Sequence, residues 1–263
     1  MLKLAVTGSG GRMGRRIVAL AVESSEFEIT AGLERSECES LGRDVGEAAG
    51  VGALGVAITE RPTEKPDVMI DFSLPDSTVM WAEYCAEHKV PIVVGTTGLD
   101  VEQKKKLQYA SKNTAVLLGA NMSLGVNLLF KLVEQVAGKL PEDYDVEVVE
   151  AHHRFKRDAP SGTALELSRH IAGARNWPWP ECQEHGREGK DALRRDKSIG
   201  MHAVRGGDIV GQHSVIFSAL GETVTLQHQA HSRDTFVRGA LQAAKWLADR
   251  EAGMYNMFDV LGL

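Results

Sequence analysis

The feature that most constrains the fold is the start of the chain, where a short apolar run leads directly into a glycine-rich turn. Leu2–Val6 is typical of a buried parallel strand, and residues 15–22 have the periodicity of a helix. Between them, Gly8, Gly11 and Gly14 are spaced G-x-x-G-x-x-G. A strand, a glycine turn and a helix in this order present backbone N–H groups to a pyrophosphate. The stretch therefore predicts a dinucleotide-binding α/β domain.

The second predicted strand, Phe27–Leu33, ends in a pair of opposite charges. Glu34 follows twenty residues after Gly14, where a carboxylate can accept hydrogen bonds from ribose hydroxyls. Arg35 has the opposite preference, because a guanidinium pairs well with the 2′-phosphate of NADP. We therefore expect both NADH and NADPH to be accepted. The alternative for Glu34 is an acid in a solvated loop.

Three more apolar runs, at residues 67–73, 91–98 and 114–118, predict further strands of the same sheet. A helix is expected to open at Pro75, since proline is tolerated in a first turn. The polar turns Gly95–Thr97 and Gly119–Met122 come after the last two strands, where ligands bind to parallel sheets. Ordinary loop structure is the alternative for either turn by itself.

The second half of the chain has a different pattern, and we place the domain boundary near Met122. Residues 123–136 are helical in periodicity, and 145–151 alternate as a strand. Residues 174–198 are expected to form a long surface loop. Residues 232–248 predict a C-terminal amphipathic helix.

Three long strands separated by glycine turns are expected near the C-terminus, at Ile199–Val204, Asp208–Leu220 and Thr223–Ala230. They have apolar residues on both faces, for example Val215 and Phe217 against Ile216 and Leu220. An antiparallel sheet of this kind needs a helix layer on one side and often another subunit on the other. Oligomerisation is therefore expected.

The candidate catalytic and substrate-binding side chains are concentrated in residues 150–164, which read E-A-H-H-R-F-K-R-D-A-P-S-G-T-A. His152 and His153 can exchange protons near neutral pH. Three cations, Arg154, Lys156 and Arg157, make the segment positive, and the turn before the next helix offers N–H groups to an anion. Such a site suits a small polycarboxylate that must also be protonated.

The helix after this segment is predicted to run from Thr163 to about Ile171, because Thr163 and Glu166 have the spacing of a capping box. Capping would occupy the Thr163 hydroxyl but leave the amides of Gly162 and Thr163 available to a ligand.

The histidines have two other interpretations. Cys182 and His185 could join them around a metal, but the neighbouring cations oppose a divalent ion and no zinc-site spacing is present. No metal is therefore expected. The histidines could also be plain surface residues at the end of a strand.

Composition narrows the partners. A formal net charge of −6 argues against general nucleic-acid binding. No segment is apolar and long enough to suggest a membrane span. Three widely spaced cysteines indicate a reducing compartment, so a cytoplasmic location is expected.

Several segments resemble the dihydrodipicolinate reductase family of the diaminopimelate route to lysine. The 150–164 segment is the most specific match. The others are V-T-G-S-G-G-R-M-G-R, D-F-S-x-P, V-G-T-T-G, A-N-M-S-L-G-V-N and V-R-G-G-D-I-V-G-Q-H. The resemblance runs from end to end apart from residues 174–198. Leu74 stands where some members of the family have arginine, so this position lacks the cation that would make an extra phosphate contact.

The resemblance implies an α/β fold with a Rossmann-type parallel-sheet nucleotide domain, formed by residues 1–122 plus 233–263. An α+β domain with an open mixed sheet, residues 123–232, would bind the substrate and assemble a homotetramer. The implied activity is reduction of the dicarboxylate 4-hydroxy-tetrahydrodipicolinate by NADH or NADPH. A non-catalytic NAD(P)-sensing protein is the alternative from another class.

The resemblance also implies roles for individual residues. His152 and Lys156 would donate protons, while His153, Gly162 and Thr163 would hold the substrate. Fifteen residues would hold the cofactor: Gly8, Ser9, Gly10, Gly11, Arg12, Met13, Glu34, Arg35, Gly95, Thr96, Thr97, Gly119, Ala120, Asn121 and Met122. The chemistry agrees with the residues, because reduction of a system conjugated to C=N leaves negative charge that a positioned acid must quench.

Overall fold

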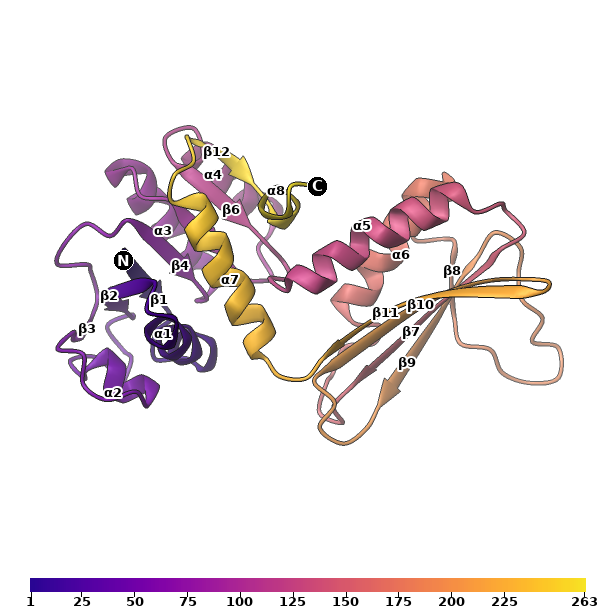
Figure 1. The fold of residues 1–263 in the computed structure, drawn as a ribbon, viewed down its shortest axis with the longest axis horizontal. Helices are drawn as coiled ribbons and strands as arrows, with labels where there is room; N and C mark the ends of the chain where they lie inside the picture. Colours follow the sequence, from indigo (N-terminus) through magenta and orange to yellow (C-terminus); the bar gives the residue numbers. More distant parts are fainter. The chain divides into compact units, whose positions relative to one another are not determined.

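The computed structural model describes residues 1–263, which form two compact units (Figure 1). The first unit comprises Met1–Leu124 together with Asp234–Leu263, and the second comprises Gly125–Arg233. None of the helices has both the length and the apolar character needed to cross a membrane.

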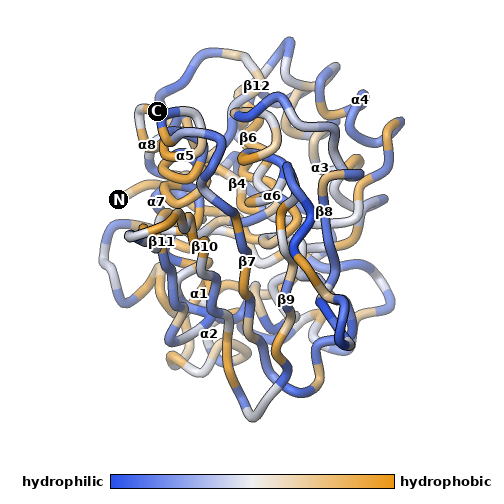
Figure 2. The backbone as a smooth tube through the Cα atoms, turned by 90° about the vertical axis from the view of Figure 1, so that its right-hand side faces the viewer, coloured by the Kyte–Doolittle hydropathy of each residue, from blue (hydrophilic) through white to orange (hydrophobic).

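The first unit is built on a seven-stranded sheet in which all neighbouring strands are parallel. The order across the sheet is β12-β6-β5-β4-β1-β2-β3. The strands are β1 (Leu2–Thr7), β2 (Phe27–Leu33), β3 (Ile58–Thr59), β4 (Val68–Asp71), β5 (Ile92–Val94), β6 (Ala115–Leu118) and β12 (Gly253–Tyr255). The central strands are apolar without alternation, as in residues 68–70 of β4 and in β6 (Figure 2), because helices cover both faces of the sheet.

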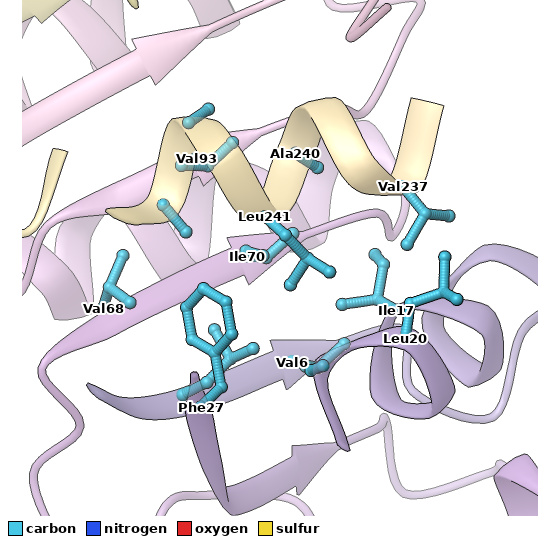
Figure 3. Packing of buried hydrophobic residues seen from close by; sticks show 14 of the residues in the cluster. Val6, Ile17, Leu20, Phe27, Val68, Ile70, Val93, Val237, Ala240 and Leu241 are labelled. Carbon is cyan, nitrogen blue, oxygen red and sulfur yellow. The ribbon is translucent and has the colours of Figure 1, made fainter. Parts of the chain in front are cut away.

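Six helices belong to this unit: α1 (Arg12–Ser24), α2 (Val45–Ala49), α3 (Pro75–His88), α4 (Val101–Ala110), α7 (Asp234–Leu247) and α8 (Met257–Leu261). On one face, Ile17 of α1 and Leu241 of α7 pack with Val6 and Ile70 of the sheet (Figure 3). Full burial of such side chains contributes about 1.5–3 kcal/mol each. The C-terminal helix therefore completes the hydrophobic core of the N-terminal sheet.

The opposite face of the sheet is covered by α3 and α4. Trp81 of α3 and Leu107 of α4 share a second buried cluster with Met69 and Ile92 of the strands. Proline occupies the first turn of α3, so the predicted helix start at Pro75 is confirmed. The predicted parallel-sheet nucleotide fold is confirmed as well.

The second unit is a five-stranded sheet in the order β11-β10-β7-β9-β8, with two helices on one of its faces (Figure 1). Its strands are β7 (Asp145–His152), β8 (Gln183–His185), β9 (Ile199–Arg205), β10 (Gly211–Ala219) and β11 (Glu222–Ala230). Its helices are α5 (Leu124–Lys139) and α6 (Gly162–Arg175).

The strand pattern alone predicted an antiparallel sheet, which is correct for β10 with β7 and β11 but wrong for β9. β9 pairs in parallel with β7, so the sheet is mixed. The reason lies in the connection, because the chain from β7 crosses over through α6 before it returns as β9.

The prediction that both faces of this sheet are apolar is wrong. Val215 and Phe217 are fully buried on the helix side, whereas Ile216 lies on the other face between Ser214 and Ser218. Leu220 follows the end of β10 and is fully exposed. The uncovered face is therefore mixed in polarity.

The prediction that residues 174–198 form a surface loop is correct for most of the segment but wrong for part of it. The segment contains β8, which is hydrophilic in sequence (Figure 2) but pairs with β9. Trp177 and Cys182 are buried. Two arginines of the segment, Arg187 and Arg194, bind the carboxylate of Glu147 on β7. These long-range contacts hold the segment against the sheet.

Candidate active site

The glycine turn of the first unit is packed too closely for a side chain at several of its glycine positions. Gly8 has φ +68°, and a Cβ there would lie 2.4 Å from the carbonyl oxygen of Phe72. A Cβ on Gly14 would lie 2.1 Å from the carbonyl oxygen of Gly8. Gly11 is the N-cap of α1, and no side chain caps this helix. The first N–H groups of α1 can therefore serve an anion such as a pyrophosphate.

Glu34 lies beside this turn, at the end of β2. Its Oε1 accepts a hydrogen bond of 2.8 Å from the backbone N–H of Gly10. A Cβ on Gly10 would lie 2.2 Å from Ser40 Oγ and 3.2 Å from the same carboxylate oxygen. Arg35 is exposed next to it, as are Gly11 and Arg12, while Met13 is half-buried and Ser9 is buried. The predicted ribose-binding acid and its arginine are thus brought to the glycine turn.

A buried carboxylate that the sequence analysis missed organises the next turn. Asp71, at the end of β4, is fully buried and accepts hydrogen bonds from the hydroxyls of Thr7, Ser73 (2.5 Å), Thr78 (2.6 Å) and Thr96 (2.8 Å). Its strand-end position was the only available signal, because its partners are spread over the sequence.

The predicted turn Gly95–Thr97 follows β5 and is held by this network. Thr96 is buried and its hydroxyl also accepts from the Ser73 N–H at 3.0 Å, whereas Thr97 is exposed. A Cβ on Gly95 would lie 2.2 Å from the ring of Phe72. The glycine is therefore required by the aromatic side chain packed against it.

The predicted turn Gly119–Met122 follows β6. The Gly119 N–H donates to the Val94 carbonyl at 3.0 Å, and Asn121 Oδ1 accepts from the Ser123 N–H at 2.9 Å. Met122 is buried, and Gly239 of α7 approaches its carbonyl so closely that a Cβ would lie 1.7 Å away. Ala120 is exposed between them.

These turns follow the carboxyl ends of β1, β2, β5 and β6, which belong to one parallel sheet and lie along the same edge. The residues fit a dinucleotide, because the glycines at positions 8, 10 and 14 allow a tight turn in which a Cβ would collide with neighbouring protein atoms, and this turn leads directly into the start of α1. The uncapped helix and a carboxylate beside it provide the partners that phosphate and ribose need.

In the second unit, the candidate chemistry gathers at the end of β7. His152 is the last residue of the strand and is 9% exposed. Its Nδ1 lies 2.6 Å from Oε2 of Glu150, two residues earlier on the same face. A Cβ on Gly211 of β10 would lie 3.3 Å from His152 Nε2, so a glycine leaves that side of the ring open. The chain turns away from the sheet after His152, since the Lys156 N–H donates to the His153 carbonyl.

Glu150 is the centre of this arrangement, and sequence reasoning missed its role. It is 1% exposed and accepts from both terminal nitrogens of Arg205 at 2.8 Å and from the Ser161 N–H at 3.0 Å. Arg205 Nη2 also donates to the Asp158 carbonyl at 2.6 Å. Lys156 Nζ lies 3.0 Å from the Asp158 carboxylate, and the Lys156 side chain is 21% exposed.

Helix α6 begins earlier than predicted. Ser161, not Thr163, is its N-cap, because Ser161 Oγ accepts from the Ala164 N–H at 3.2 Å. The capping-box prediction is wrong, and Gly162 and Thr163 instead form the first turn of the helix. Ser161 Oγ also lies 3.0 Å from Nε2 of His213 on β10, a second residue that the sequence analysis did not select.

The pKa values of these groups follow from burial and charge. Burial raises the pKa of Glu150, but hydrogen bonds from Arg205 and His152 outweigh it and hold that pKa below its ordinary value. Burial lowers the pKa of His152, although Glu150 acts in the opposite direction. Burial, together with the nearby His152, lowers the pKa of His213 to about 3. His213 is therefore neutral at physiological pH.

His153 is half-buried, and its Nδ1 has no hydrogen-bond partner although it is shielded from solvent. Gly162 is exposed, and no atom lies within 4 Å of an ideal Cβ built on it. The structure thus brings His152, Lys156 and the start of α6 together through Glu150 and Arg205. Arg205 and His213 lie in the segment V-R-G-G-D-I-V-G-Q-H, and only the strand register shows that they reach this place.

The fold and these two sets of residues define a class, the nicotinamide-nucleotide-dependent oxidoreductases with a Rossmann-type domain and a separate α+β domain. Sequence models narrow the class. The family model for the N-terminus of dihydrodipicolinate reductase matches residues 2–122, and the family model for its C-terminus matches residues 125–261. The chain therefore belongs to the dihydrodipicolinate reductase family.

Curated relatives match over essentially the whole length. A 4-hydroxy-tetrahydrodipicolinate reductase from Syntrophus aciditrophicus is 44% identical, covering 100% of this chain and 99% of the relative. One from Nitrosospira multiformis is 45% identical, covering 100% and 98%. A dipicolinate-bound dihydrodipicolinate reductase from Paenisporosarcina sp. TG-14 has the same fold, with a TM-score of 0.78 at 24% identity and coverage of 98% of both chains.

Proposed function

We propose that this chain is a 4-hydroxy-tetrahydrodipicolinate reductase that uses NADH or NADPH in the diaminopimelate route to lysine. One observation carries the proposal, namely the 44–45% identity to relatives of that name over the whole chain. The site supports it, because a histidine near a lysine, an arginine and a helix start suits a dicarboxylate that must be protonated.

Residues 1–122 and 233–263 form the proposed nucleotide domain, and residues 123–232 the substrate domain. The cofactor would be held by the glycine turn with Arg12 and Met13, by Glu34 and Arg35, and by the turns Gly95–Thr97 and Gly119–Met122. When bound, the nicotinamide supplies the hydride. The chain's own residues hold the phosphates at the start of α1 and the ribose at Glu34.

His152 is the proposed proton donor. Because Glu150 faces Nδ1, the proton that His152 gives up lies on Nε2. Reduction of the conjugated substrate leaves negative charge on carbon and nitrogen, and protonation by a positioned acid accelerates such a step roughly 10²–10⁴-fold. Lys156 adds positive charge and is the second proposed donor.

The substrate itself favours the acidic form of His152. Burial lowers the pKa of His152 in the free protein, and the positive charges of Lys156 and Arg205 lower it further. Two substrate carboxylates act against those cations, and negative charge nearby raises the pKa of an imidazole. Dicarboxylate binding therefore loads His152 with the proton that the reaction consumes. His153, Gly162 and Thr163 are the proposed residues that hold these carboxylates.

We further propose a homotetramer that assembles through the uncovered face of the mixed sheet and works in the cytoplasm. That face has no helix over it and mixes Val149 and Ile216 with small polar residues. All three cysteines are free, as in a reducing compartment. Native mass spectrometry measures the assembly directly, and a monomer at micromolar concentration would contradict this part of the proposal.

The deciding experiment is oxidation of NADPH, followed by its absorbance, with freshly generated 4-hydroxy-tetrahydrodipicolinate. Turnover that requires the substrate supports the reductase. Tight NADPH binding without turnover would instead favour a nucleotide sensor, which has no need for His152 or Lys156.

A further inference from the structure

We infer that Glu150 is the positioning residue of the substrate site: it sets which nitrogen of His152 carries the exchangeable proton and ties Lys156 and the start of α6 to the same point. This inference rests on the proposed role of His152 as proton donor. Glu150 is 1% exposed and is therefore shielded from solvent.

Each oxygen of Glu150 has two partners. Oε2 faces His152 Nδ1 at 2.6 Å and Arg205 Nη1 at 2.8 Å. Oε1 accepts from the Ser161 N–H at 3.0 Å and from Arg205 Nη2 at 2.8 Å. A carboxylate with four donors around it cannot rotate without losing hydrogen bonds that are costly to leave unmade when buried.

The contact determines the tautomer of His152. An ionised carboxylate only accepts hydrogen bonds, so Nδ1 must carry hydrogen. Arg205 stabilises the ionised form of Glu150. Its guanidinium donates two parallel hydrogen bonds to the carboxylate and compensates the buried negative charge. Nε2, which makes no hydrogen bond within the chain, is then the nitrogen that gains and loses the catalytic proton.

The same ion pair positions the loop that carries Lys156. Arg205 binds the Asp158 carbonyl at 2.6 Å, and the Asp158 carboxylate binds Lys156 at 3.0 Å. The Ser161 N–H donates to Glu150, and this hydrogen bond fixes the position of Ser161, the residue that caps α6. Proton donor, second cation and helix start therefore share one anchor, although Glu150 and Arg205 are 55 residues apart in sequence.

Four charged or titratable groups face His152 and influence the pH dependence of its protonation. They are Glu150 on β7, Arg205 on β9, His213 on β10 and Lys156 in the loop. Of these, only Glu150 favours the protonated imidazole, since Lys156 and Arg205 oppose it and His213 is neutral. Removing the charge of Glu150 must therefore make His152 a stronger acid.

The first test uses the full-length protein and no substitution in the network. Histidine labelled with ¹⁵N distinguishes the two neutral tautomers of an imidazole by its nitrogen chemical shifts, and comparison with His152→Gln assigns the His152 signals. We expect neutral His152 with hydrogen on Nδ1. Neutral His152 with hydrogen on Nε2 would overturn the inference.

The second test is the kinetics of Glu150→Gln. We expect kcat to fall at least about tenfold, as when other carboxylates that orient functional histidines are removed. The alkaline limb of the kcat profile should move to lower pH, while the Kd for NADPH stays unchanged. The matched control is Glu134→Gln, which alters a 2.8 Å contact between a carboxylate and Nδ1 of His170 on α5 and α6 and should leave kcat unchanged.

Loss of folding does not leave the inference untested. Glu150→Gln leaves the Arg205 charge without its carboxylate partner. The double variant Glu150→Gln/Arg205→Met removes both charges of the pair. It should show the same loss of kcat and the same shift of the alkaline limb. A folded variant of either kind with wild-type kcat and wild-type pH profile would overturn the inference. Wild-type turnover in His152→Gln would instead overturn the proposed proton donor and leave the tautomer measurement standing.

Discussion

Ser161 Oγ and His213 Nε2 lie 3.0 Å apart, which joins the N-cap of α6 to the second buried position of β10. The same hydroxyl accepts from the Ala164 N–H, so one side chain serves both the helix and the sheet. Ser161 is 2% exposed, so water cannot easily replace its hydroxyl if the side chain is removed.

Ser161→Ala should lower the free energy of unfolding by about 1–2 kcal/mol, since loss of an N-cap costs roughly that much. Urea titration measures the change. Thr163→Ala is the comparison, because the sequence pattern placed the cap there. A larger loss for Thr163→Ala than for Ser161→Ala would contradict the observed cap.

His213 makes stability depend on pH. Its folded pKa is about 3, below the ordinary 6.5, so the folded protein disfavours the protonated form. This contribution to stability is fully present above pH 6.5 and is lost as the pH falls toward 3. Between pH 7.5 and 5, the urea midpoint should fall less in His213→Gln than in the wild type. His185→Gln, at an exposed histidine of β8, should behave as the wild type does. Equal pH dependence in all three proteins would rule out this role of His213.

His152→Gln and Lys156→Ala should each lower kcat by roughly two orders of magnitude, because general acid catalysis contributes about that much. Steady-state oxidation of NADPH gives kcat, and fluorescence titration gives the Kd for NADPH. That Kd should be unchanged, since both residues belong to the second compact unit. Turnover near the wild-type rate in both variants would remove these residues from the mechanism.

Pyridine-2,6-dicarboxylate should inhibit competitively with the substrate. It offers two carboxylates to the N–H groups at the start of α6 and to the positive charge of Lys156. Inhibition should weaken as salt rises from low to physiological ionic strength, because part of the attraction is Coulombic. Noncompetitive inhibition, or none, would mean that the loop binds another class of ligand.

Glu34 and Arg35 should permit use of both nicotinamide cofactors. The values of kcat/KM for NADH and NADPH are expected within about tenfold, a difference of roughly 1.4 kcal/mol. Arg35→Ala should selectively weaken NADPH. Glu34→Gln keeps an oxygen for the Gly10 N–H but removes the charge that repels a 2′-phosphate, so it should favour NADPH over NADH. A preference beyond a hundredfold that neither change alters would place cofactor choice elsewhere.

The sequence by itself determined the elements whose signals are local. The apolar run at Leu2–Val6, the close-packed glycines and Pro75 at the start of α3 each act through neighbouring residues, so their structures could be predicted. Glu34 could also be placed, because the end of β2 lies a fixed distance from the glycine turn in this fold.

Only the tertiary structure decided how the second unit pairs and which residues surround His152. The parallel pairing of β9 with β7 brings Arg205 opposite His152, and the antiparallel pairing of β10 brings His213 opposite Glu150. No local propensity specifies a register between strands separated by a helix and a long connection, because register is set by the packing of whole faces.

The choice between Ser161 and Thr163 as helix cap has the same explanation. Both residues are suitable caps by their local chemistry. Glu150 holds the Ser161 backbone and His213 holds its hydroxyl, so two contacts from distant strands select the earlier residue. Local chemistry offered both positions, and the energy of buried long-range hydrogen bonds decided between them.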